Sequence, residues 1–419
     1  MKINFMEAVQ IISGGTPSTK NPLYWGGSIP WLSVVDFGSV NKYVFATEKH
    51  ITDDGLHNSA TKMLHQNDII ISARGTVGAM AMLGKPMAFN QSCFGLRGKP
   101  EIINQDFLFY YLRFYMKNIT QKAQGSVFST INLDTFKSIE LDIPSIQNQK
   151  AIARILSNID RKIDNNNTIN AELEAMAKTI YDYWFLQFEF PNENGKPYKS
   201  SGGKMVYNEE LKREIPEGWK VSDLSNVIEV IRGVAYDVQD ISPNEIDGYV
   251  PLVKSNNIQS DQLILDDIIY VNKNNVSDEQ ILTKNSVFVT MSSGSTEHVG
   301  KTATIYYDMP YCYGAFCSKI NINPLYRCFV SLFFSSEYFK KKIRTIVVGT
   351  SIKNINNSHL INNLIAFPPM DILLKFETMV APFFDKQGAI IQENQELASL
   401  RDFLLPLLMN GQVGFKEEA

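Results

Sequence analysis

The sequence has few of the residues from which metal sites and covalent catalysis are usually built. Its 419 residues include only four cysteines and five histidines. No two cysteines form a C-x-x-C pair, and no histidine lies near a cysteine at a metal-ligand spacing. We therefore predict no metal site, and we expect the cysteines to be buried and reduced. No Ser-His-Asp pattern or H-E-x-x-H motif is evident, so the sequence shows no residues that we can assign to catalysis.

Long hydrophobic runs are also missing. No apolar stretch approaches the roughly 20 residues that span a bilayer, and Glu7 interrupts the N-terminal segment where a secretory signal would be apolar. A hydrophobic content of 44% and a charged content of 20% are typical of folded globular proteins. We expect a cytoplasmic protein without disulfides, long enough for several domains.

The net charge of −4 is not the excess of positive charge that is typical of nucleic-acid-binding proteins. Acidic residues outnumber basic ones over residues 370–419, which suggests protein-facing surfaces there. The densest basic cluster consists of Lys340, Lys341, Lys342 and Arg344. Net charge says little about such a local patch, so charge alone decides nothing.

Two segments come close to catalytic motifs but lack their essential residues. STEHVGKT (295–302) has Ser295 where a P-loop needs its first glycine, and a β-branched segment follows it instead of a helix. FPPM (367–370) resembles the [ND]-P-P-[YF] tetrad of amino-methyltransferases. Phe367 and Met370 can neither hold an amine nor stack on a base. We predict neither ATP binding nor methyl transfer on this chain.

The sequence does contain a large internal duplication. Residues 125–184 and 349–408 share a Gly-Ser/Thr loop, a proline and a long heptad pattern, at an offset of 224 positions. Lys2–Gly15 and Lys220–Gly233 match at an offset of 218. The first apolar seam contains Ile152, Leu156, Ile159, Ile163, Asn166, Asn170, Leu173, Ala177, Ile180 and Trp184. Its counterpart contains Phe376, Val380, Phe383, Gln387, Ile390, Asn394, Leu397, Arg401, Leu404 and Leu408.

These seams predict two long helices that form a coiled coil, because the 3-4 spacing continues for over four heptads. The span from Ile152 to Trp184 corresponds to roughly 50 Å of helix. Asn170 and Asn394 occupy the same seam position. Since a polar residue in an apolar seam usually fixes register, we predict an antiparallel pair in which these asparagines face each other.

The remaining segments predict two similar α+β domains. Strands are expected at 29–37 and 67–75 and a buried helix at 106–119, and the second copy repeats them at 249–258, 285–294 and 328–343. The predicted fold is thus two mixed α/β domains joined by an antiparallel coiled coil, with pseudo-two-fold symmetry. The expected boundaries are 1–144 (first domain), 145–190 (first helix), 191–214 (exposed linker), 215–368 (second domain), 369–410 (second helix) and 411–419 (tail).

Polar, glycine-containing loops recur at matching places in both copies. They cover 13–25, 73–78 and 125–132 in the first copy, and 292–300 and 349–356 in the second. Such loops present hydroxyl, amide and basic groups that suit phosphates and base edges. The alternative, for any single residue of these loops, is that it forms part of a connecting turn and binds nothing. Because the loops recur while their residues differ, we predict two related domains that read different targets.

The candidate contact residues are polar or basic side chains of these loops. In the first domain they are Thr16, Ser18, Lys20, Arg74, Thr76, Ser126, Ser129 and Thr130. In the second domain they are Ser255, Asn256, Ser293, Ser295, Thr296, His298, Lys301, Thr350, Ser351 and Lys353. Arg74 is suited either to reading guanine through a bidentate contact or to clamping a phosphate.

Three motifs in this arrangement carry a family resemblance. The S-G-G-T-P-S segment (13–18), N-D-I-I-I-S-A-R-G-T-V-G (67–78) and I-P-E-G-W-K (215–220) occur with two variable domains that alternate with two repeated helices. This whole-chain pattern resembles the DNA-specificity subunit of type I restriction-modification systems. The first copy departs from the pattern because it lacks the E-G-W segment.

The resemblance implies a non-catalytic protein of bacterial defence against foreign DNA. Each domain would read one half of a bipartite, asymmetric double-stranded DNA sequence. The coiled coil would recruit two methyltransferase subunits, through which restriction-translocase subunits join. S-adenosylmethionine, ATP and Mg would then bind those partners, with no cofactor on this chain. Two alternatives are an autonomous enzyme with a cryptic site and a specificity subunit for a single polypeptide that both cleaves and methylates.

Overall fold

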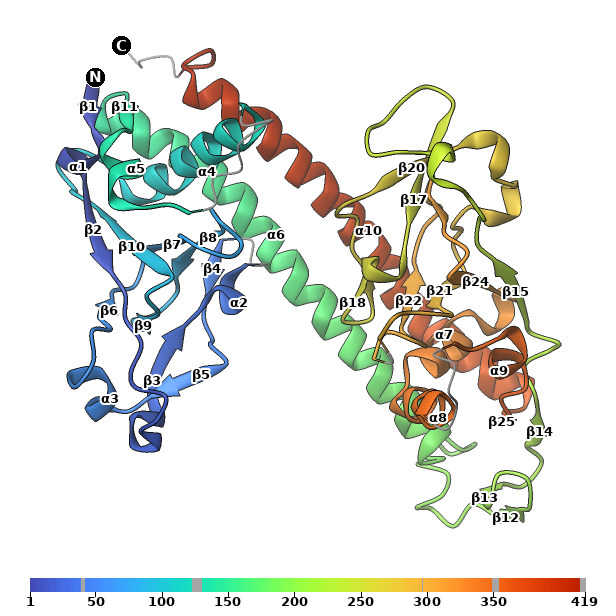
Figure 1. Cartoon of the computed structure of the whole chain (residues 1–419). Coiled ribbons are helices and arrows are strands. Elements are labelled where there is room, and N and C mark those ends of the chain that lie inside the picture. Colours follow the sequence, from blue (N-terminus) through green and yellow to red (C-terminus); the bar gives the residue numbers. More distant parts are fainter. Residues whose placement is uncertain (39–41, 123–129, 296, 349–353, 415–419) are drawn as a thin grey trace. The chain divides into compact units, whose positions relative to one another are not determined.

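The computed structural model describes residues 1–38, 42–122, 130–295, 297–348 and 354–414. The chain divides into two compact units (Figure 1). Unit 1 is Met1–Asn167 with Glu393–Ala419, and unit 2 is Thr168–Gln392. Each unit therefore contains one globular domain, the start of the long helix that follows this domain, and the end of the other long helix.

The two long helices are α6 (Ile146–Tyr181) and α10 (Met370–Met409), and α6 continues into a π-helical turn, η2 (Asp182–Leu186). Pro144 precedes α6, and two prolines precede α10. This placement is expected, because proline is tolerated just before a helix and in its first turn but breaks a helix from the inside. Both helices lie where the heptad pattern predicts them.

The helices pair in antiparallel fashion inside each unit, as predicted. In unit 1, Arg401 Nη1 donates to Asp160 Oδ1 at 2.8 Å, and Asn166 Nδ2 donates to Asn394 Oδ1 at 2.8 Å. Rising numbers on α6 thus meet falling numbers on α10. In unit 2 the same sense holds, because Gln387 donates to the main-chain oxygen of Asn170, while the rings of Trp184 and Phe376 lie 5.7 Å apart.

The predicted partner of Asn394 is wrong by one helical turn. The amide nitrogen of Asn394 donates to Asn167 Oδ1 at 2.9 Å, and its oxygen accepts from Asn166 rather than from Asn170. Asn166 also donates to Glu393, which pairs with Lys162 at 3.2 Å. This register gives the buried amide of Asn166 a full set of polar partners, and buried polar groups require such partners.

The domain of unit 1 contains a five-stranded sheet of order β2-β10-β7-β8-β4. Its strands are Val9–Ser13, Cys93–Gly98, Ile69–Ser72, Met80–Leu83 and Tyr43–Val44. A four-stranded sheet of order β5-β3-β9-β6 is formed by Lys49–Ile51, Trp25–Leu32, Met87–Phe89 and Met63–Leu64. A short pair joins β1 (Lys2–Asn4) to β11 (Glu140–Asp142). Short helices lie at Phe5–Ala8 (α1), Asp53–His57 (α3) and Leu133–Lys137 (α5).

The domain of unit 2 repeats this plan. Its sheet of order β15-β24-β21-β22 consists of Ile228–Arg232, Cys317–Ile322, Ser286–Thr290 and Thr302–Ile305. Its second sheet, β16-β20-β17-β23, consists of Ile241–Ser242, Ile269–Asn272, Tyr249–Val253 and Cys312–Tyr313. The short pair is β14 (Lys220–Ser222) with β25 (Ile365–Phe367). Minor elements are the hairpin β18–β19 (Ile258–Gln259 and Gln262–Leu263) and α9 (Asn357–Ile361). The duplication read from the sequence is thus present in the strand order.

In each unit, an aromatic-rich helix ties the domain to both long helices. In unit 1 this is α4 (Gln105–Lys122), whose Phe107 shares a core with Leu156 of α6 and Leu408 of α10. In unit 2 it is α7 (Arg327–Ser335), whose Phe329 shares a core with Phe376 of α10. The expected single helix at 328–343 is interrupted, because Ser336 is extended (ψ 150°) before α8 (Glu337–Val348) begins.

The four predicted strands all end early, and those expected at 67–75 and 285–294 stop at Ser72 and Thr290, where the polar loops begin. Residues 29–37 are strand only to Leu32, and a short helix, α2 (Val34–Phe37), follows. The cause is a capping interaction, in which the Asp36 carboxylate accepts the main-chain N–H of Ser33 at 2.7 Å. The same happens in unit 2, where the Asn257 side chain accepts the N–H of Lys254 at 2.8 Å. Local capping therefore outweighs the strand propensity of the β-branched residues in both copies.

The expected linker at 191–214 is more ordered than the prediction. It contains β12 (Met205–Asn208), which pairs with β13 (Arg213–Pro216). The buried ring of Phe190 stacks on Tyr198 at 4.6 Å and contacts Trp219 at 5.3 Å. Trp219 belongs to the E-G-W segment, so this segment anchors the connection between the copies. A composition rich in Pro, Gly and Ser does not reveal these aromatic anchors.

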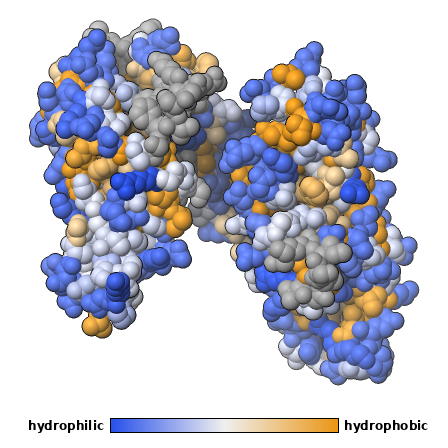
Figure 2. Space-filling model, viewed as in Figure 1, coloured by the Kyte–Doolittle hydropathy of each residue, from blue (hydrophilic) through white to orange (hydrophobic). Residues whose placement is uncertain are grey.

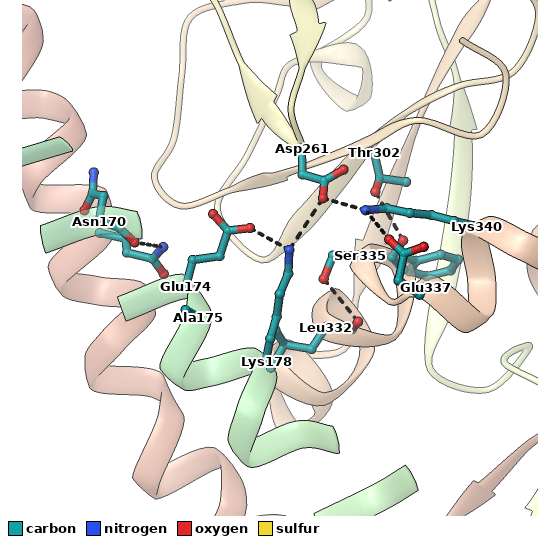
Figure 3. A network of polar contacts seen from close by, with 12 residues as sticks. Asn170, Glu174, Ala175, Lys178, Asp261, Thr302, Leu332, Ser335, Glu337 and Lys340 are labelled. Atoms are coloured by element: carbon teal, nitrogen blue, oxygen red, sulfur yellow. Dashed lines mark hydrogen bonds and ion pairs between the residues drawn. The ribbon is translucent and has the colours of Figure 1, made fainter. Parts of the chain in front are cut away.

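A polar network fixes the domain of unit 2 to the end of α6 (Figure 3). Lys178 points between Glu174 on the same helix, at 2.8 Å, and Asp261 in the β18–β19 turn, at 3.5 Å. Lys340 of α8 reaches the same Asp261 carboxylate at 2.7 Å. Lys340, part of the predicted basic cluster, is therefore engaged within the protein.

All four cysteines are free and buried. Burial raises the pKa of Cys93 and of Cys317 to about 12, so their thiols stay protonated at neutral pH. We expect a thiol reagent such as Ellman's reagent to modify none of the four in the native chain within minutes, and all four in denaturant. Rapid labelling of even one native thiol would contradict this prediction.

None of the described helices combines the length and apolarity needed to cross a membrane.

Candidate nucleic-acid interface

Several predicted loops of unit 1 meet where β7 and β10 adjoin. The N–H of Ala73, at the end of β7, donates to Ser92 O at 2.8 Å, and its carbonyl accepts from Ile131 at 3.0 Å. Thr16 hydrogen-bonds to the side chain of Gln91. Main-chain bonds and this one side-chain bond therefore gather the loops around residues 16, 74, 91 and 130 on one edge of the domain.

Unit 2 repeats this main-chain pattern. The N–H of Met291 donates to Phe316 O at 2.8 Å, and its carbonyl accepts from Ile355 at 2.8 Å. Met291, Phe316 and Ile355 correspond to Ala73, Ser92 and Ile131 through the offsets of 218 and 224. The hydrogen bonds are the same in the two copies, while Ala73 and Ser92 are replaced by Met291 and Phe316.

Glycines allow this close approach of the loops. A Cβ on Gly15 would lie 2.3 Å from main-chain atoms of Ala60 and Thr61, and one on Gly233 would lie 2.3 Å from Gly314 O. Gly75, next to Arg74, has φ +79°, which a residue with a side chain rarely adopts. Only glycine fits at these positions, so the loops have defined positions in the two copies.

The described candidates are accessible to different degrees. Five residues of unit 1 are exposed, namely Ser18, Lys20, Arg74, Thr76 and Thr130, while Thr16 is half-buried. In unit 2, Asn256 is exposed, and Ser255, Ser293, Ser295, His298 and Lys301 are half-buried. The other candidates lie outside the described residues, namely Ser126, Ser129, Thr296, Thr350, Ser351 and Lys353.

The structure brings most of the described candidates near the gathered loops. Ser255 and Asn256 follow β17, whose Val253 carbonyl accepts the N–H of Gly314 at 3.1 Å. Lys301, at the base of the 291–301 hairpin, contacts His298 Nδ1 through its ammonium at 2.9 Å. Hydrophilic residues predominate on the face of each unit seen in Figure 2.

The sequence reasoning missed one loop, which contributes Gln91 in unit 1 and Phe316 in unit 2. Both side chains are exposed, and their loop supplies the carbonyl that Ala73 or Met291 binds. An available signal was the offset of 224, which aligns 90–93 with 314–317 and pairs Cys93 with Cys317.

Among the described residues, no group of three or more His, Cys, Asp or Glu is arranged to hold a metal ion.

Comparisons with known proteins agree with the presence of two related domains in the chain. The family model of the type I restriction modification DNA specificity domain matches residues 4–175 and 216–397. The specificity subunit of type I restriction enzyme MjaIX from Methanocaldococcus jannaschii is 27% identical over 416 residues, covering 97% of this chain and 92% of that protein. The EcoKI specificity subunit of Escherichia coli is 31% identical over 207 residues, covering 48% of this chain and 44% of that protein.

A solved structure shows the same fold. The crystal structure of the type I restriction-modification S subunit from M. genitalium superposes with a TM-score of 0.57 at 16% identity, covering 97% of this chain and 95% of that one. The chain therefore belongs to the type I restriction-modification DNA-specificity family, and it carries the family's domain twice.

Proposed function

We propose that this specificity protein reads a bipartite, asymmetric double-stranded DNA sequence, with one half-site for each domain. The observation that carries the proposal is the repeated scaffold of main-chain hydrogen bonds around Ala73 and Met291. A shared scaffold with different side chains supports one mode of docking and two different base sequences. The protein itself would cut and methylate nothing.

The gathered loops have the chemistry that this role needs. The exposed guanidinium of Arg74 can donate two parallel hydrogen bonds, the geometry that reads the O6 and N7 atoms of guanine. Hydroxyl groups such as those of Thr76 and Thr130 can bind phosphates or either type of base edge. The other candidate residues of both loop sets would share these contacts.

We further propose that the long helices recruit two methyltransferase subunits, and through them restriction-translocase subunits. Support comes from Met176 of α6 and Leu400 of α10, which are exposed apolar residues at positions 224 apart. Single exposed apolar residues are common on protein surfaces, so the support lies in their recurrence at the same position of the two copies. Two equivalent positions would give each methyltransferase copy one docking position. S-adenosylmethionine, ATP and Mg would bind those partners rather than this chain.

Mapping methylated adenines across the genome of the source strain, with and without this chain, tests the proposed function. We expect deletion of its gene to abolish methylation at one motif made of two separated, unlike half-sites. Unchanged methylation, or loss at a single contiguous motif, would overturn the proposal. The purified chain incubated with S-adenosylmethionine and DNA should transfer no methyl groups, whereas an autonomous enzyme would.

The Arg74→Ala substitution separates the two possible roles of this guanidinium. If Arg74 reads guanine, the assembled complex should lose roughly 1–3 kcal/mol of discrimination at one base pair and accept other bases there. If Arg74 clamps a phosphate, binding should weaken evenly for all sequences. Binding to a panel of single-base variants of the site measures the difference.

A matched control for this substitution is Lys85→Ala. Lys85 is an exposed cation beyond the opposite end of β8 from the Arg74 loop. Its replacement should change neither affinity nor sequence preference. An equal effect of both substitutions would show a general charge effect rather than a contact at the Arg74 loop.

A further inference from the structure

Phe316 combines a fixed main chain with an exposed ring. It lies in the loop between β23 and β24, and 67% of its surface is exposed. Its carbonyl accepts the N–H groups of Met291 at 2.8 Å and Ser292 at 3.1 Å, and the adjacent Cys317 donates to Gly314 at 2.9 Å. The main chain of Phe316 is therefore fixed beside the 292–295 loop, while its ring is exposed to solvent.

The exposure of Phe316 contrasts with the burial of the residues that flank its loop. Tyr313, at the end of β23, and Cys317, at the start of β24, are buried. Exposing a phenylalanine ring to water costs free energy, and phenylalanine has no polar group that offsets this cost. Burial of the ring against a partner would remove the cost. Single exposed apolar residues are common, so the significance of Phe316 lies in its place, on a loop that main-chain hydrogen bonds join to the candidate loops.

The same position differs in unit 1. Ser92 occupies it, with exposed Gln91 beside it, while the carbonyl makes the equivalent main-chain hydrogen bond. The scaffold is thus constant and the side chain changes from polar to apolar. This is the behaviour expected of a position that sets specificity and not of one that supports the fold.

We propose that Phe316 contacts the 5-methyl group of a thymine in the half-site read by the second domain. The thymine methyl is the apolar group that base pairs present in the major groove, and phenylalanine is among the residues that contact it. The proposal rests on the proposed function, because it assumes that this face binds duplex DNA. It adds a residue outside the polar candidates and names the base that the residue recognises.

Replacing thymine by uracil tests the contact, because uracil lacks only the methyl group. Each thymine of the second half-site is replaced in turn in a duplex carrying the mapped target, and binding by the complete complex with methyltransferase is measured. We expect one position at which uracil weakens binding roughly fourfold, the amount that one buried methyl group contributes. The Phe316→Ala complex should bind thymine and uracil equally at that position, and Phe316→Leu should retain part of the difference.

Several results would overturn the inference. They are a uracil series without effect, a second half-site without thymine, or a Phe316→Ala complex that keeps the wild-type discrimination. Equal weakening of thymine and uracil duplexes by Phe316→Ala would indicate that the ring stacks between base pairs instead. A wild-type complex that binds no bipartite site would refute the proposed function itself, which separates the two failures.

Leu325→Ala is the matched control. Leu325 is also an exposed apolar residue of this domain, at 51%, but it lies beyond the opposite end of β24. Its replacement should leave the thymine preference unchanged. Uracil substitutions in the first half-site should give equal results with wild-type and Phe316→Ala complexes, and thermal unfolding of each variant checks that it folds.

Discussion

Replacing Arg401 by alanine is expected to destabilise unit 1 by about 3–5 kcal/mol, because it leaves the buried carboxylate of Asp160 without its cation. The two side chains are 8% and 1% exposed, and their atoms lie 2.8 Å apart. Burial lowers the pKa of Arg401, but the hydrogen bond and charge of Asp160 outweigh burial and raise that pKa. The hydroxyl of Tyr110 also donates to Asp160, so the domain shares this network with both helices.

Amide hydrogen exchange is the suitable measurement, since it reports the opening of residues 146–167 separately from the rest of the chain. Lys204→Ala serves as control because it removes an ion pair with Glu217 whose side chains are 70% and 53% exposed. Such a pair contributes at most about 1 kcal/mol. Similar effects of the two substitutions would contradict the importance of burial. Replacing both Asp160 and Arg401 by apolar residues should recover much of the loss.

Adding the methyltransferase subunit is expected to raise the affinity of this chain for its DNA site about a thousandfold or more. The described candidate contacts include three Lys or Arg side chains, namely Lys20, Arg74 and Lys301, so the isolated chain should bind in the range of non-specific complexes, roughly 10⁻⁴–10⁻⁶ M. Specific complexes bind at about 10⁻⁸ M or tighter. Partner subunits that clamp the duplex would supply the missing phosphate contacts.

Fluorescence anisotropy with a labelled duplex, repeated over a series of salt concentrations, measures this effect. The logarithm of the affinity of the complex should fall more steeply with the logarithm of salt concentration than that of the chain alone, because each added phosphate contact releases counterions. A duplex with a scrambled site controls for sequence-independent binding. Equal affinity with and without the methyltransferase would contradict the assembly model.

The duplication made the main architecture predictable from sequence alone. Heptad seams placed α6 and α10, and a strand pattern that occurs twice predicted two domains of one topology. The offset of 224 carried this prediction, because chance rarely aligns ten seam positions. The antiparallel sense of the helix pair was predicted correctly, although the asparagine pairing proposed with it was wrong by one helical turn.

The details that the sequence did not reveal depend on contacts between distant residues. The partner of Asn394 is set by Lys162 and Glu393, which satisfy the buried amide of Asn166. The helix after Leu32 depends on a single carboxylate that caps Ser33. Phe316 escaped notice because the search for binding loops favoured polar side chains, whereas its importance comes from exposure, which only the fold determines.

The sharing of helices between the units limits how such a gene can evolve. Tyr110 in the first domain and Arg401 in the last helix meet at one carboxylate although 291 positions separate them in the sequence. A foreign first domain acquired by recombination must therefore be compatible with a helix encoded far downstream, after the second domain. Loop residues such as those at 74 and 91 face no such restriction, so new DNA preferences can arise there without disturbing the inherited framework.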